Sequence, residues 1–356
     1  MTALDPPFGT ADAAGMAARM DGAPAQITDQ LQRLAGHRWT LPPRAPALLA
    51  VGGMGGSAMA AELCAAIWAD RLPRPLLVVR EYRWPACVGP DALALLSSYS
   101  GNTEETLALW REAQARGVPR VAMATGGTLG EWAAGDGAPA APLPPGSPPR
   151  AALYAGWVTV THLLHALGWL DDPAPMWRET ASALAGLVGR WGPVNTESDN
   201  PAKELARALL GRRVFVYAAS ERTGAVATRL RHQLAENAKV LGHSALVPEL
   251  DHNEIVGWER PGEEWRDVSL VVLEDREDAP EVATRLTLTA EYAQVRGAVV
   301  HRVALPSGER LSRMAGGVLF ADYVSLYLAL LRGVDPTPIA SIDAFKRRLA
   351  ERAAAS

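Results

Sequence analysis

Short apolar segments alternate with helical ones along most of this chain, and that alternation limits the fold more than any other feature of the sequence. The strands predicted in the first half cover residues 47–51, 76–80, 93–98 and 120–125, with helices at 57–69 and 103–117 between them. Strands that alternate with helices build βαβ units, whose strands lie parallel in one sheet. The first half is therefore predicted to be an α/β domain.

The same alternation restarts in the second half. Strands are predicted at 213–220, 268–275 and 298–305, helices at 223–241 and 281–297, and two closing helices at about 312–332 and 339–353. At 356 residues the chain is also long for one hydrophobic core. We therefore predict an α/β fold with two domains, residues 1–190 and 191–356, each a mostly parallel sheet flanked by helices.

Two segments lack this periodicity. Residues 136–150 are rich in proline, which neither pairs centrally in a sheet nor continues a helix, so we expect a loop there, followed by helices at 151–170 and 174–191. Residues 1–25 are rich in alanine, glycine and proline, and we expect a loosely ordered start that leads into a helix.

The composition argues against several classes of protein. Hydrophobic residues make up 48% of the chain and charged residues 21%, as in ordinary soluble domains. A net charge of -4 without any basic block argues against a broad nucleic-acid surface. The two cysteines, Cys64 and Cys87, fit a reducing cytoplasm. No signal peptide is apparent, and no apolar run reaches the about 20 residues that a membrane span needs.

A glycine-rich turn joins the first predicted strand to the helix that follows it, in LLAVGGMGGSAMAAEL at 48–63. Gly53, Gly55 and Ala58 nearly match the dinucleotide fingerprint G-x-G-x-x-G/A, and Glu81 could bind a ribose at the end of the next strand. The same turn also suits a phosphate ester, because a helix N-terminus presents free N–H groups to an anion. The turn alone leaves both interpretations open.

A second turn favours the phosphate ester. In SSYSGNTEET, residues 97–106, the hydroxyls of Ser98, Ser100 and Thr103 gather where a helix begins, and Gly101 allows a tight turn. Simple helix capping would also explain such residues. However, ligands of open α/β sheets bind at the carboxyl ends of the strands, where this turn and the first one are expected to meet. A dinucleotide would leave the second turn unexplained.

The corresponding turn of the second half carries carboxylates instead of hydroxyls. VVLEDREDAPEV supplies Glu274, Asp275, Glu277 and Asp278 at this point. Carboxylates repel phosphate. We therefore expect only the first half to hold the phosphate.

GGMGGSAMA together with SSYSGNTEET resembles the SIS (sugar isomerase) domain family. With LAENAK at 234–239 and ELDHNE at 249–254, the chain resembles more narrowly the bifunctional phosphoglucose/phosphomannose isomerases, from about residue 25 to 350. This resemblance implies that the phosphate is held by Gly55, Gly56, Ser57, Ser98, Ser100 and Thr103. It implies a homodimer in which His252 reaches the partner's site.

The resemblance also implies the catalytic residues. Glu236 matches the catalytic base, His252 the ring-opening histidine, Arg150 an arginine after the first domain's last strand, and Lys346 a lysine that reaches the substrate. Thr337 is the nearest match to a small hydroxyl residue that makes room for both sugar epimers. Asp251 stands where the family more often has asparagine, and a carboxylate beside the imidazole would favour its protonated form.

The chemistry of aldose–ketose isomerisation is consistent with these residue types. It needs an acid/base at the ring oxygen, one carboxylate to move a proton between C2 and C1, and positive charge near the enediolate. It needs no cofactor, and the histidines show no zinc-type spacing.

Other readings remain open. Each catalytic candidate also has a structural interpretation: Glu236 at the edge of an apolar helix stripe, His252 in a solvated turn, Arg150 in an ion pair, and Lys346 near a helix end. A non-catalytic phosphosugar sensor and a nucleotide-dependent oxidoreductase are the alternative functions.

Overall fold

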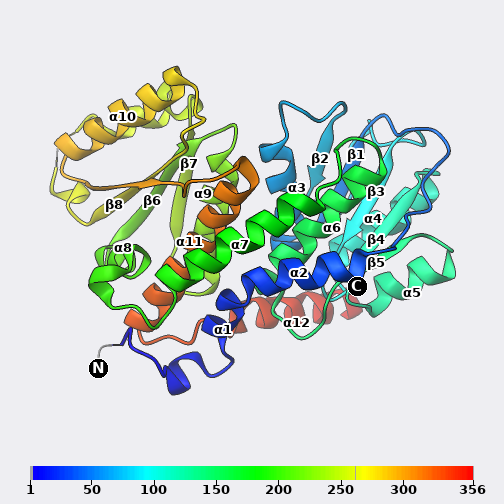
Figure 1. Ribbon diagram of the computed structural model, residues 1–356, viewed down its shortest axis with the longest axis horizontal. Coiled ribbons are helices and arrows are strands. Elements are labelled where there is room, and N and C mark those ends of the chain that lie inside the picture. The colour runs from blue at the N-terminus through cyan, green and yellow to red at the C-terminus, as the bar shows by residue number, and fades with distance from the viewer. Residues whose placement is uncertain (1–2, 261, 356) are drawn as a thin grey trace.

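Two parallel sheets dominate the computed structural model, which describes residues 3–260 and 262–355 (Figure 1). The first sheet has the order β2-β1-β3-β4-β5 and the second β7-β6-β8-β9, and all paired neighbours are parallel. The strands are β1 Leu49–Gly53, β2 Leu76–Val79, β3 Leu93–Ser97, β4 Arg120–Ala124, β5 Ala140–Pro142, β6 Arg213–Ala219, β7 Gly242–Val247, β8 Val268–Glu274 and β9 Val299–Ala304. The predicted α/β class with two mostly parallel sheets is confirmed.

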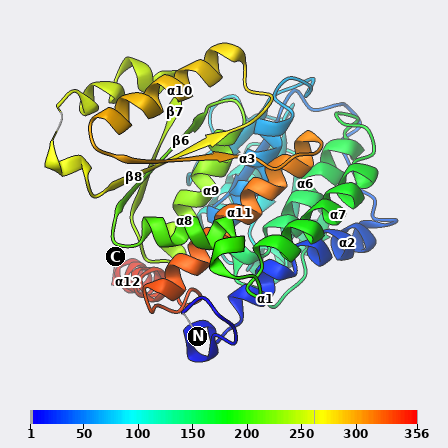
Figure 2. The ribbon, with the colours of Figure 1, turned by 60° about the vertical axis from the view of Figure 1, so that its left-hand side comes forward.

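Helices cover both faces of each sheet. They are α1 Met16–Asp21, α2 Ala23–Leu34, α3 Gly55–Ile67, α4 Glu104–Ala115, α5 Gly127–Gly135, α6 Leu153–Ala166, α7 Ala174–Trp191, α8 Pro201–Leu209, α9 Thr223–Glu236, α10 Pro280–Val295, α11 Arg310–Leu331 and α12 Ala340–Ala355. Helices α3, α9 and α11 lie side by side between the two sheets, where they form a core shared by both halves (Figure 2). Helices α4 and α5 cover the outer face of the first sheet, and α10 that of the second.

Helix α11 is the central element of the shared core. Within the part of the chain that the structure describes, it is the one helix long and apolar enough to cross a membrane, but 94% of its most apolar stretch is buried inside the protein. Its two buried charges are paired, Arg313 with Asp275 at 3.0 Å and Asp322 with Arg229 at 2.8 Å. The apolar character of α11 is therefore that of a core helix.

Several elements depart from the sequence prediction. The proline-rich segment contains the short edge strand β5, which ends at Pro142, where a missing N–H breaks no central pairing. Strand β7 and helices α5 and α8 were not predicted. Strand β7 and helix α5 are short and carry little periodic signal, whereas α8 has a clear apolar stripe of Ala202, Leu205, Ala206 and Leu209 that the sequence analysis missed. The N-terminal segment is helical over Met16–Asp21 and buries Met16 and Met20, so the expected loose start is wrong for these residues.

Helix α9 ends at Glu236, five residues before the predicted end at 241. Lys239 adopts a left-handed conformation with φ of 56°, which a continuing helix does not allow. The early end of α9 matters for the site, because it places Glu236 on the last turn of the helix.

The acidic turn after β8 forms ion pairs with arginines of α11. Asp275 and Glu277 bind Arg313 at 3.0 and 2.8 Å, and Glu277 also binds Arg310 at 2.7 Å. These pairs fasten the first turn of α11 to the second sheet. Since β8 holds the same place in its sheet as β3 in the first, the two halves use equivalent turns differently.

His232 on α9 makes stability depend on pH. Burial, with Arg231 and Arg229 nearby, lowers the pKa of His232 to about 4. The unfolded chain therefore binds more protons than the folded protein between pH of about 6.5 and about 4, and stability falls as the pH falls through this window. We expect a smaller drop in Tm between pH 7 and pH 5 for His232→Gln than for the wild type. Equal drops in thermal scans would contradict this origin.

Candidate functional site

Two turns at the carboxyl ends of neighbouring strands form the floor of the candidate site. Strands β1 and β3 pair in parallel and end in register at Gly53 and Ser97. The backbone N–H of Tyr99 donates to Ser57 Oγ at 3.1 Å, and the Ser97 hydroxyl donates to the Ser57 carbonyl at 2.8 Å. The two predicted phosphate turns thus meet and are bonded to each other.

Glycine is required where these turns approach other backbone. A Cβ on Gly53 would lie 2.7 Å from the Ser97 carbonyl oxygen. Gly101 has φ of +72°, and a Cβ there would lie 1.8 Å from the Gly126 carbonyl oxygen. Any larger residue would therefore push the turns apart.

The hydroxyls of the second turn are not used as a simple helix cap. Thr103 is the N-cap residue of α4, but its side chain makes no capping hydrogen bond. Its Oγ1 lies 2.8 Å from Oγ of the buried Ser98. Ser100 is exposed and accepts from the N–H of Asn102 at 3.2 Å. Hydroxyls beside the uncapped N–H groups of a helix start can bind an anion.

Arg150 lies directly against the first turn, in the short 3-10 helix η2 Pro149–Ala151. A Cβ on Gly56 would lie 3.0 Å from the Pro149 carbonyl oxygen and 3.3 Å from Arg150 Cα. The glycine-rich turn and the segment of the arginine are therefore in close contact, although about a hundred residues separate them in the sequence.

The Arg150 side chain is buried, and most of its donors are engaged. Nε donates to Asn237 Oδ1 at 2.8 Å, and Nη2 donates to the carbonyls of Pro336 and Thr337 at 2.7 and 2.9 Å. Nη1 faces Glu236 Oε2 at 3.4 Å. Burial lowers the pKa of the guanidinium from its ordinary value, and the Glu236 carboxylate opposes that shift. Arginine remains charged in proteins, so Nη1 can stabilise a nearby anion.

Glu236 is the carboxylate that faces Arg150, and together with Asn237 these residues form the cluster around Arg150. It is the last residue of α9, and its side chain keeps 28% of its exposure. Its carbonyl accepts from Lys239 Nζ at 2.6 Å. A partly exposed carboxylate that faces the guanidinium of a buried arginine can accept and return a proton.

A buried network, which the sequence analysis missed, supports Arg150. Arg229 donates to the Arg150 carbonyl at 2.7 Å and forms a double hydrogen bond with Asp322 at 2.8 and 2.9 Å. Gln233 donates to the same carboxylate at 2.8 Å. Burial raises the pKa of Asp322, against the lowering effect of Arg229. Asn237, within the LAENAK motif, had a sequence signal, whereas Arg229 and Asp322 are 93 positions apart and had none.

Comparison with known proteins identifies the family. Residues 198–349 match the bacterial phospho-glucose isomerase C-terminal SIS domain. The chain is 37% identical over 303 residues to the bifunctional phosphoglucose/phosphomannose isomerase of Caldicellulosiruptor bescii, over 85% of this chain and 89% of that protein. The chain belongs to the bifunctional phosphoglucose/phosphomannose isomerase family.

A second relative agrees with this assignment, and solved structures show a similar fold. The bifunctional phosphoglucose/phosphomannose isomerase of Aquifex aeolicus is 32% identical over 85% of this chain and 90% of its own. The fold is similar to that of a glucose-6-phosphate isomerase like protein from Thermus thermophilus, with a TM-score of 0.63, 22% identity, and coverage of 95% and 98% of the two chains. Tagatose-6-phosphate ketose/aldose isomerase from Escherichia coli has the same fold, with a TM-score of 0.63, 16% identity and coverage of 91% and 90%.

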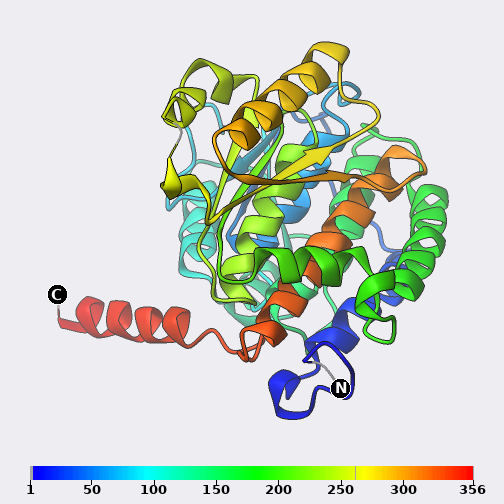
Figure 3. The same ribbon diagram turned by 90° about the vertical axis from the view of Figure 1, so that its left-hand side faces the viewer.

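Two residues that the family resemblance singles out form no hydrogen bond or ion pair with Glu236 or Arg150 in the described part of the chain. His252 is exposed at the end of the 3-10 helix η4 Glu249–His252 in the second half. The Asp251 carboxylate binds Arg285 Nη1 and Thr289 Oγ1, both at 2.9 Å. These bonds direct the carboxylate toward α10. Lys346 is exposed on α12, which extends away from the rest of the chain (Figure 3).

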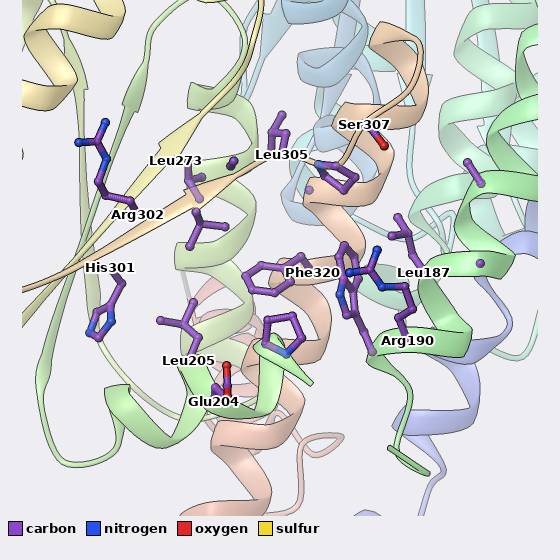
Figure 4. A pocket seen from close by; sticks show the side chains of 18 of the residues that line it. Leu187, Arg190, Glu204, Leu205, Leu273, His301, Arg302, Leu305, Ser307 and Phe320 are labelled. Carbon is purple, nitrogen blue, oxygen red and sulfur yellow. The ribbon is translucent and has the colours of Figure 1, made fainter. Parts of the chain in front are cut away.

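A large cavity lies elsewhere in this isomerase-family chain. It has a volume of about 800 Å³ and lies between α7, α8, α11 and the edge strand β9 (Figure 4). Trp191, Phe320 and Leu205 form apolar parts of its wall, and Arg190 and Glu204 supply charges. None of the predicted site residues lines it, so the cavity is separate from the cluster around Arg150.

Proposed function

We propose that the chain interconverts glucose 6-phosphate, mannose 6-phosphate or both with fructose 6-phosphate. The observation that carries this proposal is the Arg150–Glu236 pair, at 3.4 Å, next to the two bonded phosphate turns. The names of the relatives support the same reaction and the same substrates.

In the proposed reaction the phosphate binds Gly55, Gly56, Ser57, Ser98, Ser100 and Thr103. His252 opens the sugar ring by giving a proton to the ring oxygen while the C1 hydroxyl loses its proton to water, so that the C1–O5 bond breaks and the C1 carbonyl forms. Lys346 reaches the substrate from α12. Glu236 removes the proton from C2 and returns it to C1, through a cis-enediol. Arg150 Nη1, the donor nearest Glu236, stabilises the negative charge that develops between these steps. This route uses no metal and no redox cofactor.

We further propose that the protein is a cytoplasmic homodimer and that each chain has two domains, with their boundary near residue 190. His252 is exposed and, among the described residues, forms no hydrogen bond or ion pair with Arg150 or Glu236, which suits a residue that completes the site of another copy. Each dimer would then contain two sites, each built from both chains.

A coupled assay with purified protein tests the reaction. Fructose 6-phosphate is supplied after treatment with EDTA, and glucose 6-phosphate and mannose 6-phosphate are followed separately. We expect both products to form without added metal. Formation of one product alone would restrict the proposal to a single substrate specificity. Tight binding of fructose 6-phosphate without turnover would indicate a phosphosugar sensor and not an enzyme.

Mixing two inactive variants tests the shared site. In a heterodimer of His252→Ala and Glu236→Gln, one site keeps an intact Glu236 together with an intact His252 from the other chain. After random subunit exchange we expect about one quarter of the wild-type activity. A mixture as inactive as its components would show that both residues serve the same chain's site.

Thr337 is a candidate for control over the epimer that is accepted. Its carbonyl accepts from Arg150 Nη2 at 2.9 Å, and its buried Oγ1 finds no partner among the residues that the structure describes. We expect Thr337→Leu to lower kcat/KM for mannose 6-phosphate about tenfold more than for glucose 6-phosphate, because added methyl groups take space beside the sugar. Thr337→Ser, which keeps the hydroxyl, is the matched control. Equal losses for both substrates would contradict this role.

A further inference from the structure

The segment that carries His252 is bonded to neighbouring elements on both sides of that residue. It comprises η4 and a second 3-10 helix, η5 Glu254–Trp258, with Asn253 between them. The imidazole of His252 is exposed and has no hydrogen bond or ion pair among the described residues. Its direction therefore depends on how the backbone before and after it is held.

One anchor lies directly before His252. The Asp251 carboxylate accepts from Arg285 Nη1 and from Thr289 Oγ1, both at 2.9 Å. Both donors belong to α10, which covers the outer face of the second sheet (Figure 1). Charge-assisted bonds to two donors on one helix hold the carboxylate in a fixed direction. The residue before His252 is thus fastened to α10.

A second anchor lies two residues after His252. The Glu254 carboxylate accepts from the Tyr217 hydroxyl at 2.6 Å, and its two oxygens lie 2.9 and 3.0 Å from Nε2 of His243. An ionised carboxylate can only accept hydrogen bonds, so the His243 nitrogen donates here. Tyr217 belongs to β6 and His243 to β7, so Glu254 is bonded to two neighbouring strands at once.

The Tyr217 hydroxyl is itself held from a second direction. Tyr217 is fully buried, and its oxygen accepts from Trp258 Nε1 at 3.0 Å. Burial, together with the Glu254 carboxylate, raises the pKa of Tyr217 above its ordinary value, so the hydroxyl keeps the proton that it donates. Glu254 and Trp258 are the first and last residues of η5, so both ends of this helix are bonded to one buried hydroxyl.

We propose that Glu254 is a positioning residue for His252. Its bonds to Tyr217 and His243 fix the backbone after His252, and the Asp251 anchor fixes the backbone before it. The imidazole is thereby presented to the ring oxygen of the substrate in one orientation. Glu254 itself touches no reacting atom and acts through His252. This inference rests on the proposed ring-opening role of His252, and it adds the residues that orient the imidazole.

Glu254→Ala removes the acceptor that Tyr217 and His243 share. We expect kcat with fructose 6-phosphate to fall about tenfold to a hundredfold and KM to change less than about twofold, because a misplaced acid/base slows the reaction and leaves phosphate binding intact. Glu254→Gln is the conservative variant, since its Oε1 can still accept from Tyr217, and it should stay within about threefold of the wild-type kcat. An equally large loss in Glu254→Gln would overturn the proposal, because Glu254 would then transfer a proton itself.

A double-variant cycle separates positioning from folding. In a His252→Ala background the residue that Glu254 positions is missing, so adding Glu254→Ala should lower kcat no further. A purely structural role would lower activity by the same factor in both backgrounds, and that result would overturn the proposal. Glu259→Ala is the matched control and should leave kcat unchanged. Glu259 follows η5 directly and is exposed, and its carboxylate has no hydrogen bond or ion pair in the described part of the chain.

Hydrogen exchange of the full-length chain, followed by mass spectrometry, tests the anchor without relying on activity. We expect the amides of residues 249–258 to exchange faster in Glu254→Ala than in the wild type, and those of β1 and β3 to be unchanged. Unchanged exchange in residues 249–258 would overturn the proposal.

The outcomes also separate this inference from the proposed function. A wild-type protein without isomerase activity would refute the proposed function, and this inference with it. A fully active His252→Ala would do the same for the role of His252. An active wild type and an impaired His252→Ala, together with a normal Glu254→Ala, would overturn the positioning role alone.

Discussion

Replacing Glu236 by glutamine is expected to lower kcat about a thousandfold, with little change in KM. Glutamine has the same shape but cannot take a proton from C2, and general acid–base catalysis contributes about 10²- to 10⁴-fold to rate. In the wild type, Arg150 Nη1 lies 3.4 Å from the Glu236 carboxylate. The glutamine amide can still face Nη1, so the buried arginine should stay in place. Initial rates with fructose 6-phosphate measure the effect.

Glu204→Gln is the matched control for this variant. Glu204 is an exposed residue of α8 and lines the cavity of Figure 4 rather than the cluster around Arg150. It should leave kcat unchanged. Near-normal turnover of Glu236→Gln would exclude Glu236 as the base, and a large loss in Glu204→Gln would direct attention to the cavity.

Removing the buried carboxylate of Asp322 is expected to destabilise the fold by about 3–5 kcal/mol, because a charge left unpaired in the interior is costly. Asp322 is 5% exposed and is the partner of both Arg229 and Gln233, so Asp322→Ala leaves two buried donors without an acceptor. Urea unfolding followed by circular dichroism measures the free energy of unfolding.

The double variant Arg229→Met, Asp322→Leu separates stability from positioning. With both charges replaced by apolar groups, much of the lost stability should return. The hydrogen bond from Arg229 to the Arg150 carbonyl remains absent, so kcat should stay low even in a stable protein. Full activity of the double variant would show that the network supports the fold alone. A stable Asp322→Ala would contradict the expected cost of the unpaired arginine.

The candidate site could be predicted from the sequence to different extents. The two turns proposed to bind phosphate were recognisable because each occupies a short continuous segment in which glycines, hydroxyls and a helix start appear together. The positions of Arg150 and Glu236 came from a family resemblance, and their contact at 3.4 Å became visible only in three dimensions. Arg229 and Asp322 showed no local pattern, because a buried pair between two helices depends on packing.

The strands could likewise be predicted from the sequence only in part. Strands β1, β3, β6 and β8 were predicted because fully buried parallel strands are continuous apolar runs. Strands β2 and β9 lie at sheet edges but were predicted because LLVV and VVHRVA are mostly apolar. The edge strands β5 and β7 were missed because β5 is only three residues long and ends in proline, and β7 begins with Gly242, His243 and Ser244.

The α/β class, the repeated strand–helix order and the two glycine- and hydroxyl-rich turns could be predicted from the sequence, because each of these is encoded in neighbouring residues. The contacts between distant groups became visible only in the folded chain: Gly56 with the Arg150 segment, Arg150 with Glu236, and Arg229 with Asp322. Such contacts arise from the packing of α3, α9 and α11 between two sheets, and no sequence period records that packing. The exposed positions of His252 and Lys346 are likewise a result of tertiary structure, because burial depends on the whole chain.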